Sequence, residues 1–172
     1  SRGCANEQVR GYLETPSIGR YLTEGSLKES TLDALASSTL MFSDFPSFRT
    51  LVISGREYLD SGSNQVQEIA FTLNSVVYLV EEMKKRNLTE EAIFNNLELI
   101  LGIGTEYFVE IGKFRAFNSL VHLVAEKYGV EKPGYEMMTR SSVWSKSVMD
   151  SHTNMLRATT ESMSALLGNS QA

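Results

Sequence analysis

Apolar residues recur three and four positions apart over much of this chain, which is typical of amphipathic helices. Asn64, Thr89 and Thr105 are placed to cap three such helices, and Gly168 is placed to end the last one. In the first helix the spacing also predicts burial of Leu40 and Met41. The pattern predicts five helices, over residues 26–42, 64–85, 89–101, 105–128 and 152–167.

Three segments, 9–14, 49–54 and 135–141, lack the helical period and predict β-strands. The continuous apolar centre of 49–54 suits a parallel strand that is covered on both faces. No Asn-Gly hairpin signal joins two strands, and the strands alternate with helices, so we expect parallel β/α units.

The predicted elements therefore indicate an α/β fold in one domain over residues 1–172. Three parallel strands do not close a barrel, which needs about 250 residues. We expect either a small open α/β sheet or part of a larger barrel, cut from a longer protein.

Composition excludes several kinds of partner. The net charge is −5 and no run of basic residues occurs, which argues against nucleic acid. The apolar runs are too short to span a bilayer. The single cysteine, Cys4, cannot form an internal disulfide, which fits a reducing cytoplasm, and we expect a passive thiol there. His122 and His152 lack partners at metal-ligand spacing, so we expect no metal.

A group of charged residues, Glu110, Lys113 and Arg115, lies between two apolar stripes of the predicted helix 105–128. Taken alone, Glu110 and Lys113 favour an intrahelical ion pair on a solvated face. Arg115 falls between Phe108 and Ile111, so it must extend to solvent or meet a buried partner. The first stripe comprises Tyr107, Phe108, Ile111 and Phe114, and the second Leu120, Val121, Val124 and Tyr128.

Three segments carry a shared pattern in the same order and spacing: 51–55 with 60–62 and 67–70; 102–116; and 140–145 with 150 and 154–168. In register, they resemble the substrate-binding barrel of the methylmalonyl-CoA mutase family, and the match runs over residues 45–168. The resemblance implies that the chain is the middle part of a (β/α)8 TIM-type barrel, with outer helices and without the family's cobalamin-binding domain. The family interconverts methylmalonyl-CoA and succinyl-CoA through radicals from adenosylcobalamin.

Several positions that face the substrate in this family hold other residues here. The Tyr-His pair after the Ser-Gly turn is replaced by Arg56 and Glu57, and an ionised Glu57 cannot donate to a thioester carbonyl. Ser47 replaces a lysine near CoA, and Arg140 replaces a glutamine near the substrate. The Arg-Leu-Trp contact for CoA is replaced by Ser119, Leu120 and Val121.

The family's packing positions, in contrast, are kept at Glu110, Lys113, Arg115 and Trp144. In the barrel context we expect the first three to form a buried network rather than a subunit contact, and Trp144 to be a packing residue. We expect Arg56 and Glu57 to form an ion pair at the barrel mouth.

The resemblance thus implies a catalytically inactive, structural small subunit of a cytoplasmic heterodimer. A catalytic large subunit would be its partner, and adenosylcobalamin would be present in the complex without being bound by this chain. The open sheet edges are expected to make the chain self-associate. One alternative is an active acyl-CoA mutase barrel with a pocket changed by Arg56, Glu57 and Arg140. Another is a free-standing α/β binding module.

Overall fold

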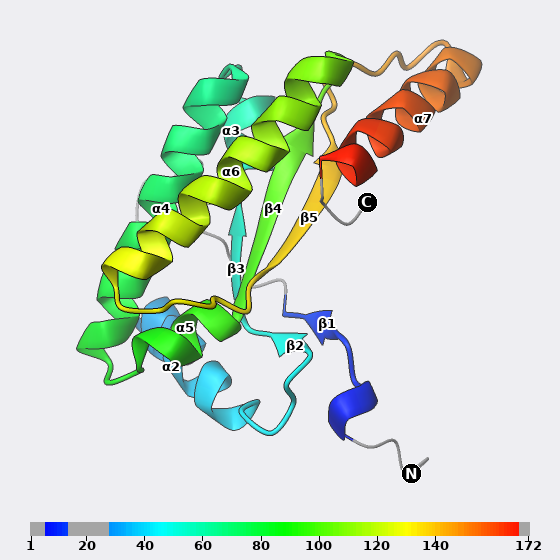
Figure 1. Cartoon of the computed structure of the whole chain (residues 1–172). Coiled ribbons are helices and arrows are strands. Elements are labelled where there is room, and N and C mark those ends of the chain that lie inside the picture. Colours follow the sequence, from blue (N-terminus) through cyan, green and yellow to red (C-terminus); the bar gives the residue numbers. More distant parts are fainter. Residues whose placement is uncertain (1–5, 14–27, 169–172) are drawn as a thin grey trace, which may run out of the picture.

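The computed structural model describes residues 6–13 and 28–168 (Figure 1). Our predictions for Cys4, for the end of the strand 9–14 and for the start of the helix 26–42 concern residues outside these ranges. The described chain begins with a short 3-10 helix, η1 (Asn6–Gln8).

All five described strands run parallel. β1 (Gly11–Tyr12) pairs with β2 (Phe48–Arg49), and Thr50 alone separates β2 from β3 (Leu51–Ser54). β4 (Leu97–Ile103) lies between β3 and β5 (Glu136–Ser141). Spatial order thus follows chain order, as in consecutive β/α units of a barrel.

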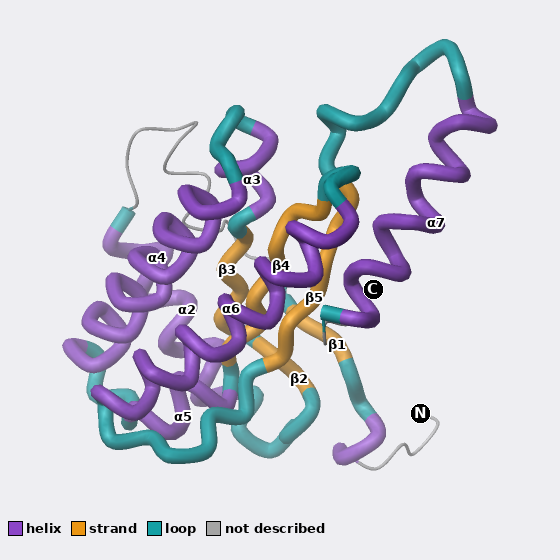
Figure 2. The backbone as a smooth tube through the Cα atoms, turned by 45° about the horizontal axis from the view of Figure 1, so that its top comes forward, coloured by secondary structure: helices purple, strands orange, loops and turns teal. Residues whose placement is uncertain are grey.

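Helices connect these strands and cover the sheet (Figure 2). The two longest, α4 and α6, contact each other and lie along one face. The predicted α/β class, with parallel strands and outer helices as in part of a TIM-type barrel, is confirmed. The helices are α2 (Glu29–Met41), α3 (Arg56–Asp60), α4 (Gln65–Lys85), α5 (Glu90–Asn95), α6 (Tyr107–Lys127) and α7 (Ser151–Leu167).

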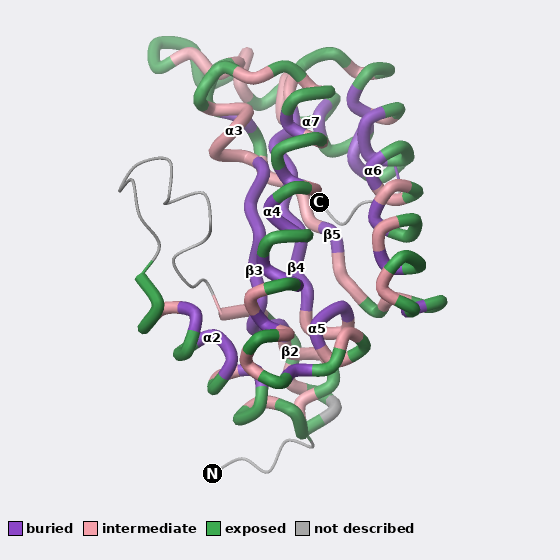
Figure 3. Tube along the Cα trace, turned by 90° about the vertical axis from the view of Figure 1, so that its left-hand side faces the viewer, coloured by how far each residue is buried: buried purple, intermediate pink, exposed green. Residues whose placement is uncertain are grey.

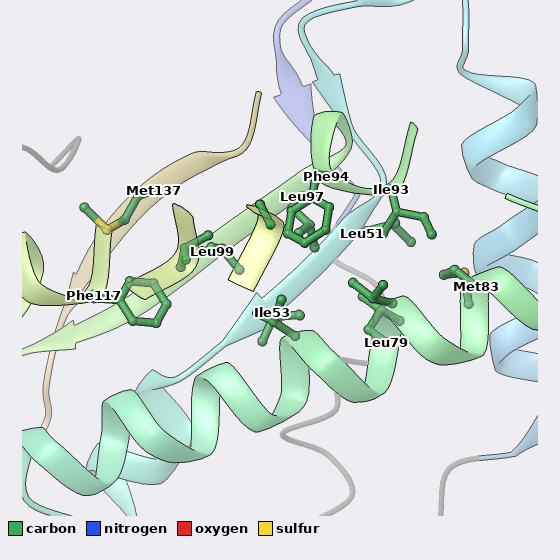
Figure 4. Packing of buried hydrophobic residues seen from close by; sticks show 14 of the residues in the cluster. Leu51, Ile53, Leu79, Met83, Ile93, Phe94, Leu97, Leu99, Phe117 and Met137 are labelled. Carbon is green, nitrogen blue, oxygen red and sulfur yellow. The ribbon is translucent and has the colours of Figure 1, made fainter. Parts of the chain in front are cut away.

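The core lies between the sheet and the helices, and β3 and β4 are buried along their whole length (Figure 3). Alternate residues of these strands face α4, α5 and α6 (Figure 4). Side chains that meet there include Ile53, Leu99, Leu79, Phe94 and Phe117.

Two of the predicted helix boundaries are confirmed at the level of single hydrogen bonds. The Asn64 side chain accepts from the Gln67 backbone N–H (2.9 Å), and Gln67 Oε1 accepts from the Asn64 N–H (3.0 Å), so α4 begins with a capping box. Gly168 is the C-cap of α7, as expected.

The predicted helix over 89–101 is wrong in its second half. Thr89 does cap a helix, but α5 ends at Asn95 and the next residues form β4, the central strand of the three-stranded sheet. A short, continuous apolar run such as 97–103 has no period that separates a buried strand from a buried helix.

The buried face of α6 also differs from the predicted stripes. Phe108 is 82% exposed, and Thr105 makes no cap, because Glu106 is the N-cap residue. The first buried residues of α6 are therefore charged. The buried side chains are Glu110, Lys113, Phe114, Phe117, Val121 and Ala125. In α2, Leu40 and Met41 are exposed rather than buried.

Candidate functional site

The carboxyl ends of β3, β4 and β5 meet at one edge of the sheet, where parallel α/β proteins bind their ligands (Figure 1). The connections that follow these strands line an open pocket of about 480 Å³ at this edge, which we call the cavity. Its wall comprises Leu59, Gly62 and Ser63 after β3; Gln65; Gly104, Thr105, Glu106 and Glu110 after β4; and Ser142, Trp144 and Ser145 after β5.

A buried ion pair completes the hydrogen bonding of β4 where β3 stops. Ser54, the last residue of β3, lies opposite Ile100, so Gly102 has no strand partner on that side. Its N–H donates to Glu68 Oε1 (2.6 Å), and its carbonyl accepts from Lys113 Nζ (2.7 Å). Lys113 Nζ also lies 2.9 Å from Glu68 Oε2. The pair therefore satisfies backbone groups that would otherwise be buried without partners.

Glu110 adds a second carboxylate to this pair, with Oε2 2.6 Å from Lys113 Nζ. The side chains of Glu68, Glu110 and Lys113 are at most 1% exposed. Burial raises the pKa of Glu68, Lys113 opposes that rise, and Glu110 adds to it. Two carboxylates thus share one ammonium group in a dry environment.

Gln65 connects this network to the cavity. Its Nε2 donates to Glu106 Oε2 (2.9 Å) and to Glu110 Oε1 (3.4 Å). Gly102 leaves room for the arrangement, because a Cβ there would lie 2.5 Å from Leu59 Cδ2.

Arg56 and Glu57 do not form the predicted ion pair. Both lie half-buried in α3, and Arg56 Nε instead lies 3.0 Å from Asp60 Oδ2, one turn further along. The side chains of adjacent helical residues point about 100° apart, whereas those of residues four apart lie side by side on the helix surface. Arg56 therefore meets Asp60 and not Glu57. Among the described residues, Glu57 Oε2 is buried without a hydrogen-bond partner.

Asp60, which our sequence analysis did not single out, joins α3 to the connection after β5. Its Oδ1 accepts from Ser142 Oγ (2.8 Å), and its backbone carbonyl accepts from Trp144 Nε1 (2.7 Å). Trp144 is 70% exposed, so it is held by its indole N–H and not by burial in the core.

A further buried carboxylate, Glu161 of α7, was also missed. It accepts from Ser141 Oγ (2.7 Å) and Ser145 Oγ (3.1 Å), and Lys146 Nζ lies 2.6 Å from both of its oxygens. Glu68, Asp60 and Glu161 all lie within the segments that resemble the family. Their buried partners were not visible in the sequence because, apart from Arg56 beside Asp60, they lie 15 or more positions away.

Arg115 lies outside the buried network in which it was expected. It is exposed, and its Nη2 donates to the Leu167 carbonyl (2.9 Å) at the end of α7. The inward face of α6 passes through Glu110, Lys113 and Phe114, which turns Arg115 toward the neighbouring helix.

The remaining substrate positions are not brought together. Ser47 precedes β2 and so lies at the opposite end of the strands from Arg56. Ser119 is exposed on α6, Leu120 is half-buried, and Val121 is in the core. Arg140 of β5 donates to the Tyr12 hydroxyl of β1 and lies 5.9 Å from the centre of that ring.

A second group of buried charges lies near the start of β4. Glu98 is 2% exposed and lies in register with Glu136 of β5. Arg49 Nη2 bonds Glu136 Oε1 and the Gly134 carbonyl, both at 3.1 Å, while Glu98 Oε1 has no hydrogen-bond partner among the described residues. Burial and the nearby Glu136 raise the pKa of Glu98 to about 7, against the opposing effect of Arg49.

Within 6–13 and 28–168, no three His, Cys, Asp or Glu side chains are grouped to hold a metal ion. The His122 ring lies 5.6 Å from that of Tyr135, and His152 is exposed. The helices of the described chain include none long and apolar enough to cross a bilayer.

The residues that line the cavity do not fit adenosylcobalamin, the cofactor that the family resemblance implies. They include no histidine to ligate cobalt. Two of the polar lining groups, Glu106 and Glu110, are acidic, so the wall offers no cation for the phosphates of CoA.

The parallel strands, the outer helices and the polar cavity at the carboxyl edge define an α/β protein built from parallel β/α units. The family model described as methylmalonyl-CoA mutase matches residues 1–172, and the chain belongs to this family. The predicted family membership is therefore confirmed.

Named relatives agree with this assignment. The chain is 31% identical over 128 residues to the methylmalonyl-CoA mutase small subunit of Porphyromonas gingivalis, covering 72% of this chain and 21% of that protein. It is 31% identical over 132 residues to the methylmalonyl-CoA mutase of Cereibacter sphaeroides, covering 75% and 19% respectively. It is 28% identical over 132 residues to the methylmalonyl-CoA mutase of Escherichia coli, covering 75% of this chain and 18% of that protein. The chain thus spans about a fifth of the length of these relatives.

Proposed function

We propose that this chain is part of a structural, non-catalytic small subunit of an adenosylcobalamin-dependent methylmalonyl-CoA mutase. Its partner is a catalytic large subunit with which it forms a heterodimer in the cytoplasm. The large subunit binds the CoA ester and the cofactor, and this chain contributes a stable barrel wall.

The observation that carries the proposal is the state of the two residues that follow the Ser-Gly turn. The Arg56 guanidinium is engaged by Asp60 of its own helix, 3.0 Å away. Glu57, when ionised, only accepts hydrogen bonds and would repel a developing oxyanion. Glu57, which stands at the position of the family's histidine, therefore cannot donate to a thioester carbonyl when it is ionised.

Two further features support the same conclusion. The cavity at the strand ends is lined by acidic groups, which disfavour a polyphosphate ligand. The network that closes the sheet, Glu68 with Lys113 and Glu110, is directed at the chain's own backbone. These residues stabilise the edge and do not present free donors to a substrate.

Calorimetric titration tests the proposal directly. The full-length gene product, without the large subunit, should give no saturable heat with methylmalonyl-CoA, succinyl-CoA or adenosylcobalamin. The same titrations with the catalytic subunit are the positive control. Saturable binding by this chain would overturn the proposal and favour an active mutase barrel of changed specificity.

A second experiment tests the partnership. Co-expression with the large subunit should yield one complex. Arg56→Ala or Glu57→Ala in this chain should leave the mutase turnover of that complex within about twofold of wild type, since neither residue touches substrate. Elution of two separate species would favour a free-standing α/β module instead. A tenfold loss of turnover in an intact complex would assign these residues to catalysis.

A further inference from the structure

A second open pocket, of about 380 Å³, adjoins the cavity at the carboxyl edge of the sheet. Its walls come from the chain just before α6, from the connection between β5 and α7, and from α7 itself; Figure 1 shows the first two at the same end of the molecule. Unlike the cavity, this pocket has two cations and no acidic residue in its lining. We call it the basic pocket. The residues that line it are Thr105, Trp144, Ser145, Lys146, Arg157 and Thr160, of which the first three also line the cavity.

Arg157 is a half-buried cation that no carboxylate of the described residues neutralises. Its Nη1 donates to the Ser145 carbonyl, and the described residues offer it no other acceptor. In contrast, Arg49, Arg56 and Arg86, which are likewise half-buried or buried, each have a nitrogen within 3.1 Å of a carboxylate oxygen. A guanidinium group has five N–H donors, so most of those of Arg157 are left for a ligand.

The buried carboxylate of Glu161 holds the second cation, Lys146, in the wall of the basic pocket. Both Glu161 oxygens lie 2.6 Å from Lys146 Nζ, and the Glu161 side chain is 1% exposed whereas that of Lys146 is 23% exposed. Ser141 and Ser145 also donate to Glu161, which fixes the position of its carboxylate. An ammonium group has three N–H donors, so one remains for a ligand after the two bonds to Glu161.

The acidic residues around the basic pocket do not cancel its charge. Asp150 is the N-cap of α7, and its pKa is lowered chiefly by the hydrogen bond from the Thr153 hydroxyl, with only a weak effect from Arg157. Glu106 lines the neighbouring cavity and not the basic pocket. The two cations of the lining, less the one carboxylate behind them, therefore leave an excess of positive charge.

We propose that the basic pocket binds the phosphate group of a small organic molecule. Arg157 and Lys146 donate to the phosphate oxygens, and two cations suit a doubly charged phosphate better than a single carboxylate. The Thr105 hydroxyl, which has no hydrogen-bond partner among the described residues, supplies a further donor. The rest of the molecule lies against Trp144, whose indole is 70% exposed and is held by the bond from its N–H to the Asp60 carbonyl.

The basic pocket requires no covering segment, because water can occupy a polar pocket, and every donor named for it lies in the described residues. Two or three charge-assisted hydrogen bonds predict a dissociation constant of roughly 1 mM for phosphate alone. The pocket provides nothing that donates to a thioester carbonyl beside Glu57. The inference therefore does not depend on the proposed role in a mutase.

Tryptophan fluorescence tests the site, because Trp144 is the single tryptophan of the chain and lines the basic pocket. Inorganic phosphate should change the emission of the 172-residue chain saturably, whereas sodium chloride at the same ionic strength should not. Arg157→Gln should raise the half-saturating phosphate concentration by about tenfold or more, and Thr105→Val by about threefold. Lys132→Gln, exposed and outside the pocket, is the matched control and should bind as wild type does. Circular dichroism shows whether each variant is folded.

Phosphorus NMR separates a free ligand from an acidic segment of a longer chain as the occupant. The resonance of inorganic phosphate should broaden in the presence of the 172-residue chain and equally in the presence of the full-length gene product. Broadening with the 172-residue chain alone would overturn a free phosphate compound as the occupant, since a carboxylate of the longer protein would then fill the pocket.

Two other results would also overturn the inference. The first is the absence of any saturable change in fluorescence when phosphate is raised far above the expected dissociation constant. The second is equal affinity in wild type and Arg157→Gln, which would place the bound anion elsewhere. Either result leaves the proposed small-subunit role untouched. A saturable heat with CoA esters that persists in Arg157→Gln, in contrast, would count against that role and not against the phosphate site.

Discussion

Buried carboxylates lie at both ends of strand β4, and the two groups differ in their hydrogen-bond partners. At the carboxyl end, Glu68 accepts from the Gly102 N–H and is paired with Lys113. Near the amino end, Glu98 Oε1 has no hydrogen-bond partner among the described residues, and Arg49, which opposes the rise in its pKa, bonds Glu136 instead. Burial raises the pKa of both carboxylates, but Glu68 has a donor on each oxygen, whereas Glu98 Oε1 has none among the described residues.

The two buried groups should therefore affect the stability of the fold differently. The Glu68 network replaces hydrogen bonds that a longer β3 would have made, so it should stabilise the fold. Among the described residues, the Glu98 carboxylate satisfies no unpaired backbone group of the sheet, so it should lower stability whenever it is ionised.

The largest effect should come from removing the one cation of the network. Lys113→Met leaves the buried carboxylates of Glu68 and Glu110 without the cation that they share and the Gly102 carbonyl without its donor, and should lower the free energy of unfolding by about 3–5 kcal/mol. Urea denaturation at pH 7 measures this loss.

Lys127→Met, exposed near the end of the same helix, is the control and should change stability by less than about 0.5 kcal/mol. A Lys113→Met/Glu68→Gln double variant should recover part of the loss, since it removes one of the unpaired charges. Equal losses at Lys113 and Lys127 would contradict the structural role of the network.

A smaller effect, of the opposite sign, is expected at the other end of β4. In the folded state the pKa of Glu98 is about 7, whereas an unfolded Glu has a pKa of about 4.3. Between these values the folded state binds more protons than the unfolded state, so stability falls as pH rises from 4.3 to 7 and is level above. Glu98→Gln removes this loss.

The Glu98→Gln variant should therefore be more stable than wild type by about 2 kcal/mol at pH 8, with most of the gain lost by pH 5. Thermal unfolding at both pH values measures the difference. Glu126→Gln, exposed on α6, should show no such dependence. A constant difference between Glu98→Gln and wild type at all pH values would mean that Glu98 does not titrate in this range.

The sequence allowed prediction of the elements whose signals are local. Asn64 marks the start of α4 because a capping box depends on residues three apart, and Gly168 marks the end of α7. The substitutions at Arg56 and Glu57 were visible because the family motif locates them.

What the sequence did not show depends on residues that are far apart. β4 was assigned to a helix because its apolar run has no period of its own. Glu68 and Lys113 are 45 positions apart, and neither position alone indicates a buried pair. Arg115 was expected beside Glu110 because stripes counted from Phe108 misplaced the inward face of α6.

The smallest effect should come from the second carboxylate of the network, and it tests why one lysine has two acidic partners. Glu110→Gln keeps an acceptor near Lys113 and leaves the Glu68 pair intact, so stability at pH 7 should change by less than about 1 kcal/mol. The negative charge of Glu110 helps to raise the pKa of Glu68, so this pKa should fall toward its ordinary value in the variant. Since a raised pKa makes stability decline with rising pH, the decline above pH 4.3 should become shallower. Unfolding free energies at pH 5 and pH 7 measure this slope, with Glu126→Gln again as the exposed control. A loss above about 2 kcal/mol would show instead that Glu110 is needed to hold Lys113 against the end of β4, which would make the two carboxylates one structural unit.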